Sequence, residues 1–328
     1  MLKVNAITVK NLIKTYRVAE KSPGVLGSIK SLVRRKYRDV LAVNDISFNV
    51  EEGELVGFIG PNGAGKTTTL KCLSGLLYPT SGEVSVLNHK PWERKTQFLK
   101  SIAFVMGQKN QLWWDLPPME TFLLNKEIYD IDGANFQETI KELSSLLEIG
   151  NILLTPVKKL SLGQRMKCEL VAALVHRPKV LFLDEPTIGL DVVIQKNLRE
   201  FIKTYNQKYQ STIILTSHYM RDVEALARRV IIIDGGKIIF DGLLETLVKK
   251  YAPYKLISLI LKKEVDVQKL KKLGIIKSYN YPQAVLSVES RETNKVVTEI
   301  LKNLPVDDIN VQEADIEDVI RHVFQNKK

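Results

Sequence analysis

A glycine-rich stretch early in the chain has the composition of a phosphate-binding loop. Residues 60–68, GPNGAGKTT, match the pattern G-x-x-x-x-G-K-[ST], with an apolar strand pattern before them and an apolar helical pattern after them. The glycines let backbone N–H groups face phosphate oxygens, and the N-terminus of the following helix adds positive potential. A chance glycine-rich turn is the alternative, and the flanking strand and helix argue against it. The candidate nucleotide contacts are Gly60, Pro61, Asn62, Gly63, Ala64, Gly65, Lys66, Thr67 and Thr68.

Three of these side chains have distinct chemistry. Lys66 would supply a point charge to the outer phosphates of a nucleoside triphosphate. Thr67 fits Mg²⁺ coordination through its hydroxyl group, and Thr68 fits contact with an inner phosphate.

Two adjacent carboxylates follow a second apolar strand. Residues 180–183, VLFL, are continuously apolar, as in a strand buried within a parallel sheet. Asp184 and Glu185 come at its C-terminal end, where α/β sheets bind ligands. Asp184 fits Mg²⁺ coordination, and Glu185 is placed to polarise an attacking water. Such a pair is more often a cap than a catalyst, but the phosphate loop in the same chain favours catalysis.

A third apolar strand, STIILTSH, ends at His218. A lone histidine is usually structural or incidental. Because this strand belongs to the same predicted sheet edge, we expect His218 to contact the terminal phosphate.

A second helix start with phosphate-binding character lies at residues 160–164, LSLGQ. It offers a serine, a glycine and a helix N-terminus. Since the chain already has a stronger phosphate loop, this segment needs another target.

These segments resemble the ATPase subunits of ATP-binding cassette (ABC) transporters. The phosphate loop, Gln108 in FVMGQKN, LSLGQ, LFLDEPTIGLD and TSH occur in the family's order and at about its spacings, over roughly residues 4–245. The resemblance implies that Tyr16 stacks on adenine and that Gln108 joins Mg²⁺ coordination and senses the membrane partner. It also implies that Asp191 couples two sites across a dimer, and that Lys66, Gln108, Glu185 and His218 carry the catalysis.

The resemblance gives the second helix start a target. In that family two cassettes pack head to tail, and each signature segment contacts the ATP held by the partner's loop. Ser161, Leu162, Gly163 and Gln164 would therefore act in trans. Leu162 departs from the family pattern, which has glycine there. A position with positive φ would disfavour leucine, so either Leu162 is helical, which we favour, or its contact with the γ-phosphate is weaker.

The implied fold is α/β, a P-loop NTPase with a RecA-like core sheet, an antiparallel β subdomain and a helical signature subdomain at about 109–175. We expect this nucleotide-binding domain over 1–245 and a small α+β domain over 246–328, whose patterns read strand, helix, hairpin and helix. The smaller domain resembles an appendage of drug-export-like family members. A passive stabilising cap is an equal alternative.

Two further segments bear on the branch of the family. An insertion at 18–40 contains a basic amphipathic pattern over 24–38, which fits a membrane surface, the membrane subunit or packing on its own domain. Trp113 and Trp114 are adjacent in a loop, as at interfaces, although a core position for one is a clear alternative. With LSLGQRMK, these segments resemble the drug- and viologen-export-like branch, whose ATPases work with separately encoded membrane subunits.

Composition limits the function classes. The net charge of +11 favours an anionic partner, which could be nucleotide, lipid or nucleic acid. The apolar runs are too short to cross a bilayer, and the first residues lack a secretory leader pattern. Cys72 and Cys168 lie in apolar helical patterns and favour reduced core thiols.

We therefore expect an ATP-hydrolysing subunit that powers an ABC transporter, an exporter rather than an importer, with ATP and Mg²⁺ as cofactors. The expected partners are a second copy or a related ATPase, and integral membrane permease subunits, at the cytoplasmic face of the membrane. Nucleic acid or the ribosome is a less favoured partner, because the chain has neither two cassettes nor a long coiled coil. A non-hydrolysing ATP-binding module is the other alternative; Leu162 favours it, and Glu185 and His218 argue against it.

Overall fold

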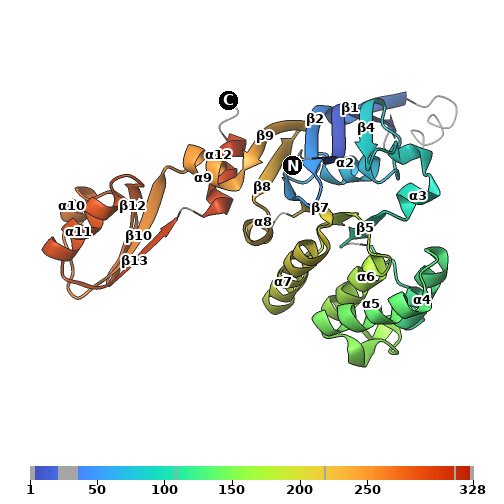
Figure 1. The fold of residues 1–328 in the computed structure, drawn as a ribbon. Coiled ribbons are helices and arrows are strands. Elements are labelled where there is room, and N and C mark those ends of the chain that lie inside the picture. Colours follow the sequence, from blue (N-terminus) through green and yellow to red (C-terminus); the bar gives the residue numbers. More distant parts are fainter. Residues whose placement is uncertain (1–3, 21–35, 108, 218, 314, 326–328) are drawn as a thin grey trace, which may run out of the picture. The chain divides into compact units, whose positions relative to one another are not determined.

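The computed structural model describes residues 4–20, 36–107, 109–217, 219–313 and 315–325 (Figure 1). The chain divides into two compact units, Met1–Asp241 and Gly242–Lys328. Gln108, His218 and most of the basic segment at 24–38 lie outside the described residues.

A six-stranded sheet forms the centre of the first unit. Its strand order is β5-β6-β7-β3-β8-β9, and the four pairings from β5 to β8 are parallel. The strands are β3 Leu55–Ile59, β5 Ile102–Met106, β6 Val180–Asp184, β7 Thr212–Thr216, β8 Arg229–Asp234 and β9 Lys237–Leu243. β3 and β7 are buried at every residue, as expected for parallel strands covered on both faces. The polar residues that end these strands therefore gather at one edge.

An antiparallel sheet of order β2-β1-β4 covers helix α2, which lies between the two sheets in Figure 1. Its strands are β1 Asn5–Glu20, β2 Lys36–Glu51 and β4 Ser81–Val86, and α2 spans Lys66–Leu73. Leu70 and Leu73 of α2 are fully buried, and one hydrophobic core joins α2 to both sheets. This packing fixes the start of α2 against the central sheet.

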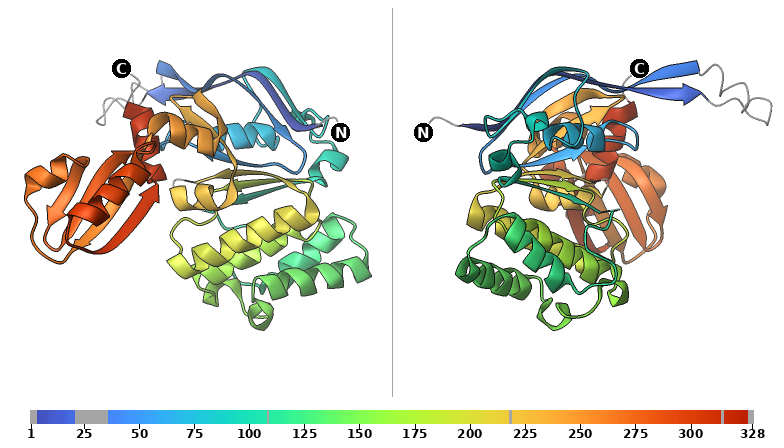
Figure 2. Two further views of the ribbon diagram at one scale, coloured as in Figure 1. Left: turned by 60° about the vertical axis from the view of Figure 1, so that its left-hand side comes forward. Right: turned by 90° about the vertical axis from the view of Figure 1, so that its right-hand side faces the viewer.

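The ends of the predicted insertion belong to these strands. β1 and β2 pair as far as Glu20 and Lys36, with Val18 opposite Arg38, and run on together as a two-stranded ribbon in Figure 2. Residues 18–20 and 36–40 are therefore extended. The amphipathic helical pattern expected over 24–38 is thus wrong at 36–38, its described part. The Arg17 guanidinium lies over the Tyr37 ring, 4.5 Å from its centroid, within this cross-strand pairing.

Helices gather on the face of the central sheet opposite α2 (Figure 2). The longer ones in the first unit are α4 Pro118–Ile128, α5 Gly133–Leu146, α6 Leu162–Leu174, α7 Val192–Tyr209 and α8 Met220–Leu226. The shorter elements are η1 Pro91–Glu93, α3 Thr96–Leu99, η2 Gly150–Ile152 and η3 Val157–Lys159. Asp132 caps α5 by accepting hydrogen bonds from Ala134 and Asn135 N–H groups. Cys72 and Cys168 are buried free thiols in α2 and α6.

The second unit contains a β-α-β-β-α-β arrangement. Its antiparallel sheet has the order β11-β12-β10-β13. The elements are α9 Leu244–Tyr251, β10 Tyr254–Leu261, α10 Val267–Lys271, β11 Ile275–Asn280, β12 Gln283–Glu289, α11 Thr293–Asn303, β13 Val306–Glu313 and α12 Ile316–Gln325. The expected strand, helix, hairpin and helix correspond to β10, α10, β11 with β12, and α11. β13 was not expected, because it is a largely exposed edge strand whose Asp307 and Asp308 interrupt alternation. Among the described residues, no helix is long and apolar enough to cross a membrane.

Candidate functional site

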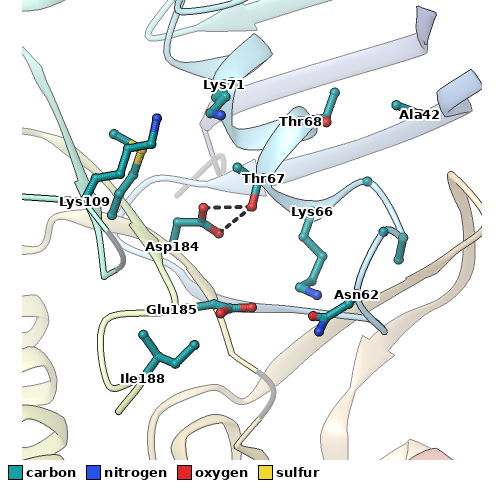
Figure 3. Close-up of a pocket in the computed structure, with 14 residues that line it drawn as sticks. Ala42, Asn62, Lys66, Thr67, Thr68, Lys71, Lys109, Asp184, Glu185 and Ile188 are labelled. Carbon is teal, nitrogen blue, oxygen red and sulfur yellow. Dashed lines mark hydrogen bonds between the residues drawn. The ribbon is translucent and has the colours of Figure 1, made fainter. Parts of the chain in front are cut away.

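The phosphate loop and the carboxylates of β6 meet in one cleft of about 700 Å³ (Figure 3). β3 delivers the loop, and α2 begins directly after Gly65, which has φ of 106°. A Cβ atom at Gly65 would lie 2.4 Å from the Ala42 carbonyl oxygen, so only glycine fits this approach. Among the described residues, no side chain caps α2. The first N–H groups of α2 are therefore available to an anion.

Lys66 is folded back over the loop. Its side chain is nearly buried, and Nζ donates to the carbonyl oxygens of Gly60 and Pro61 at 2.6 and 3.1 Å. Burial lowers the pKa of Lys66, and the negative charges of Glu185 and Asp184 oppose that shift. The ammonium group thus lies between the loop and the carboxylates, where phosphate oxygens would be bound.

Asp184 is held by two hydroxyl groups. Thr67 Oγ1 donates to its two carboxylate oxygens at 3.1 and 2.8 Å, and Thr216 Oγ1 donates to Oδ1 at 2.7 Å. An adjacent carboxylate and hydroxyl group, open to a cleft, suit the oxygen-preferring ion Mg²⁺. Within the described ranges, no group of three or more His, Cys, Asp or Glu side chains could hold a metal. A Mg²⁺ ion here would therefore need further ligands from phosphate and water.

Glu185 has a left-handed backbone conformation, with φ of 54°. Its N–H group donates to both the carbonyl oxygen and Oγ1 of Thr216, each at 3.1 Å. A Cβ atom at Gly107 would lie 2.0 Å from the Glu185 carbonyl oxygen, so the backbones are in direct contact just after β5 and β6 end. A strained glutamate held from two sides is typical of a functional position.

The structure brings together most of the loop residues expected from sequence. Asn62, Gly63, Ala64, Gly65, Lys66, Thr67, Thr68, Asp184 and Glu185 all line the cleft. Tyr16 does not line the cleft. It pairs with Val40 in β2, and Ala42 of the same strand does line the cleft. Gln108 and His218 lie outside the described residues.

Five of the residues that line the cleft were not predicted from the sequence, and neither was Thr216, the buried hydrogen-bond partner of Asp184 and Glu185. Ala42, Lys71, Met106, Lys109 and Ile188 complete the cleft. Thr216 is fully buried and contacts both Asp184 and Glu185. Its signal was its position in TSH, two residues before His218, where the sequence analysis assigned a role only to the histidine.

The second helix start is capped by its own side chains. Ser161 Oγ accepts from the Gln164 N–H group at 3.2 Å, and Gln164 Oε1 accepts from the Ser161 N–H group at 2.9 Å. Leu162 is the first residue of α6 and has no positive φ, so it adopts the helical conformation that we favoured. Its Cδ2 atom lies against Gly189, 3.3 Å from the position of a Cβ atom there. Ser161, Leu162, Gly163 and Gln164 do not line the cleft among its described residues.

Asp191 caps α7. Its carboxylate accepts from the Ile194 N–H group at 2.9 Å. Gly163 approaches the same helix start, because a Cβ atom there would lie 3.0 Å from Ile194. The starts of α6 and α7 therefore pack side by side, away from the lining of the cleft.

Comparisons with known families and proteins agree with this geometry. The ABC transporter family model matches residues 43–188, and the EvrA-like ABC transporter C-terminal domain model matches residues 253–312. The ABC transporter ATP-binding protein NatA of Bacillus subtilis is 33% identical over 217 residues, covering 65% of this chain and 88% of that protein. The bacitracin transport ATP-binding protein BcrA of Bacillus licheniformis is 32% identical, covering 67% and 71%. A Nod factor export ATP-binding protein I of Burkholderia orbicola is 34% identical, covering 64% and 68%.

Solved structures share the fold of the larger unit. An ATP-binding subunit of an ABC transporter has a TM-score of 0.62 at 23% identity, covering 75% of this chain and 93% of that one. A dimeric ATP-binding cassette bound to ADP and Pi has a TM-score of 0.60 at 24% identity, covering 73% and 98%. The expected P-loop NTPase architecture, with its antiparallel subdomain and its C-terminal domain, is confirmed.

Proposed function

The chain belongs to the ATP-binding subunits of ABC transporters, and from this premise we propose that it powers an exporter by closing with a second cassette on two ATP molecules. One observation carries the dimer. The phosphate loop and both carboxylates line one cleft, whereas the capped start of α6 does not contribute to its described lining. A single chain thus holds half of each composite site.

Catalysis at the cleft follows from the position of each group. The N–H groups at the start of α2 and the Lys66 ammonium bind the outer phosphates. Glu185 orients and polarises the attacking water, and His218 contacts the terminal phosphate. Tyr16 stacks on the adenine from the strand beside the cleft.

Mg²⁺ fits the oxygen atoms of Thr67 and Asp184, with Gln108 as a further ligand. When bound, the ion would neutralise negative charge that develops on the phosphates. Thr216 keeps the Asp184 carboxylate oriented toward the same place through its 2.7 Å hydrogen bond.

The signature residues act on the partner's ATP. Ser161, Leu162, Gly163 and Gln164 form the start of α6, where Ser161 and Leu162 are exposed and Gly163 is buried. A γ-phosphate approaching from a second copy would meet the helix N-terminus there. Asp191 lies beside them at the start of α7 and couples the two sites. A homodimer is sufficient because one chain carries both halves, and a related ATPase could serve as the second cassette.

The helical region is the proposed docking site of separately encoded permease subunits. Leu123, Leu124 and Ile128 of α4 are exposed, as are Trp113 and Trp114 in the loop before it. A neighbouring cleft of about 380 Å³ reaches Ile128 and is lined in part by apolar side chains of α3 and β5. Exposed apolar side chains around a cleft fit a helix or loop of another protein.

The export direction is supported by relatives whose names specify bacitracin transport and Nod factor export. Such a subunit acts at the cytoplasmic face of the membrane, where ATP is available. The basic residues within 24–38 would favour an anionic surface there.

The test is a Glu185→Gln variant of the full chain. It should bind ATP, lose turnover and elute as a dimer with ATP but as a monomer with ADP, measured by light scattering after gel filtration. A variant that hydrolyses ATP at the wild-type rate would remove Glu185 from its role. Loss of turnover without an ATP-dependent dimer would instead contradict the closure step.

A further inference from the structure

A buried carboxylate outside the cleft joins three elements of the first unit. Asp222 of α8 is fully buried. Its Oδ1 accepts from Arg199 Nη1 of α7 at 2.8 Å. Its Oδ2 accepts from the hydroxyl groups of Thr187 and Ser217, the second at 2.9 Å. Asp222 therefore has a charged partner and two neutral donors from separate segments.

The ion pair alone would explain the stability of a buried charge. Arg199 compensates Asp222, as a buried carboxylate requires. The two hydroxyl groups are different, because they come from the segments that leave the sheet edge at the cleft. Thr187 is two residues after Glu185, and Ser217 directly follows Thr216 and precedes His218. Both hydroxyl-bearing residues are buried, at 2% and 1% exposure.

Each hydroxyl-bearing residue is tied to its own segment as well. The Thr187 carbonyl oxygen accepts from Gln195 Nε2 at 3.4 Å, and the same amide donates to Leu190 at 3.1 Å. Ser217 Oγ accepts from the Tyr219 N–H group at 2.9 Å. A shift of either segment would therefore be transmitted to Asp222 Oδ2.

We propose that Asp222 is a positioning residue for ATP hydrolysis, which holds the segment from Glu185 to Asp191 at a fixed distance from the end of β7 through Thr187 and Ser217. This inference rests on the proposed roles of Glu185 and His218. Asp222 does not itself line the described cleft, so it acts only through its two hydroxyl donors. Ile188, the neighbour of Thr187, lines the cleft and transmits the constraint to it.

The decisive variant is Thr187→Val in the full chain, which removes one hydroxyl group at nearly constant volume and leaves the ion pair intact. Loss of one buried hydrogen bond that acts in the transition state should lower kcat by about tenfold. The KM for ATP should stay nearly unchanged, because the phosphate loop is untouched. Thr187→Ser, which restores the hydroxyl group, should recover most of the rate.

A matched control is Thr121→Val in α4. Thr121 is also buried, but its hydroxyl group has no hydrogen-bond partner in the described part of the chain. This variant should keep the wild-type kcat. If Thr121→Val and Thr187→Val lower kcat equally, the effect is a general consequence of the Thr-to-Val change and the inference is overturned.

The second donor gives an independent check. Ser217→Ala should lower kcat in the same way, and the double variant should be no slower than the slower single variant, because both break one link. The inference is overturned if the two substitutions lower kcat additively in the double variant. It is also overturned if Thr187→Val keeps the wild-type kcat while its thermal unfolding midpoint is unchanged. Glu185→Gln measured alongside separates the two hypotheses, since normal hydrolysis in that variant contradicts the proposed function whatever Thr187→Val does.

Discussion

Two helices of the first unit begin where the sequence predicts contacts with phosphate, and the structure completes the two helix starts differently. α2 starts after Gly65 with no side-chain cap among the described residues and lines the cleft with Asp184. α6 starts after Ser161, whose hydroxyl group accepts from the Gln164 N–H group, while the Gln164 side-chain amide accepts from the Ser161 N–H group. The first N–H groups of α2 are thus available to an anion, whereas the start of α6 is partly satisfied by its own side chains. Two similar helix starts in one chain can therefore differ in whether their first N–H groups are left available to a ligand.

The surroundings of the two helices sharpen this contrast. α2 is covered by the antiparallel sheet and is fixed by Leu70 and Leu73 in the main core. At the start of α6, Ser161 and Leu162 are exposed, Gly163 is buried against Ile194, and Leu162 lies against Gly189 just before α7. The cleft opens to the start of α2, whereas the ligand that we propose for the start of α6 is ATP held by a second cassette.

The largest expected effect concerns the cleft. Lys66→Met removes the ammonium group beside the phosphates and should lower ATP turnover by at least about 100-fold, measured as phosphate release. Lys71→Met, five residues later on α2 and also in the cleft lining, is the matched control and should have a much smaller effect. Equal losses in the two variants would mean that general positive charge, rather than the position of Lys66, supports turnover.

A second prediction concerns the end of α6. His176 follows α6, stacks on Tyr129 at 3.8 Å between ring centroids and contacts the Ile102 carbonyl oxygen of β5 through Nε2 at 3.0 Å. Burial lowers the pKa of His176 from 6.5 to about 4, which the contact with Ile102 partly opposes. Because the unfolded chain binds this proton more readily, stability is lost as the pH falls from 6.5 toward 4.

The expected loss from His176 is roughly 2 kcal/mol of unfolding free energy at pH 5 relative to neutral pH. His176→Phe should remove this part of the pH dependence, measured by urea unfolding at pH 7.5 and pH 5. If wild type and variant lose the same stability between these pH values, His176 is not the group that makes the region around α6 acid-sensitive.

A third prediction separates capping from function at α6. Ser161→Ala should destabilise the unit by about 1 kcal/mol through loss of the cap. It should also lower ATP turnover by about tenfold if Ser161 contacts the partner's ATP. Asp132→Ala removes the cap of α5 and should cost similar stability with unchanged turnover. Unchanged turnover in Ser161→Ala would reduce this residue to a structural cap.

Sequence reasoning succeeded where chemistry restricts the residue type locally. The phosphate loop needs glycines at fixed places, and a buried parallel strand needs a continuous apolar run, so the loop and β6 could be predicted. β13 could not, because an exposed edge strand needs no apolar alternation. The ends of β1 and β2 are extended because they pair with each other. The basic amphipathic pattern of this segment gives no sign of that pairing.

Contacts between residues far apart in the chain also could not be predicted from the sequence. Thr216 and Asp222 are ordinary residues in the sequence, and their partners Glu185 and Thr187 are 31 and 35 residues away. Only the fold brings them together. The self-capping of Ser161, by contrast, is local and follows the capping-box spacing of serine and glutamine.

The most direct test of the composite site is a mixing experiment with two inactive variants. Lys66→Met damages the phosphate loop and Ser161→Arg blocks the signature helix, so neither homodimer should turn over ATP. In an equal mixture, half of the dimers hold one intact site, and about a quarter of the wild-type activity should return. Activity in the mixture that equals only the average of the two separate variants would contradict a site shared between two chains.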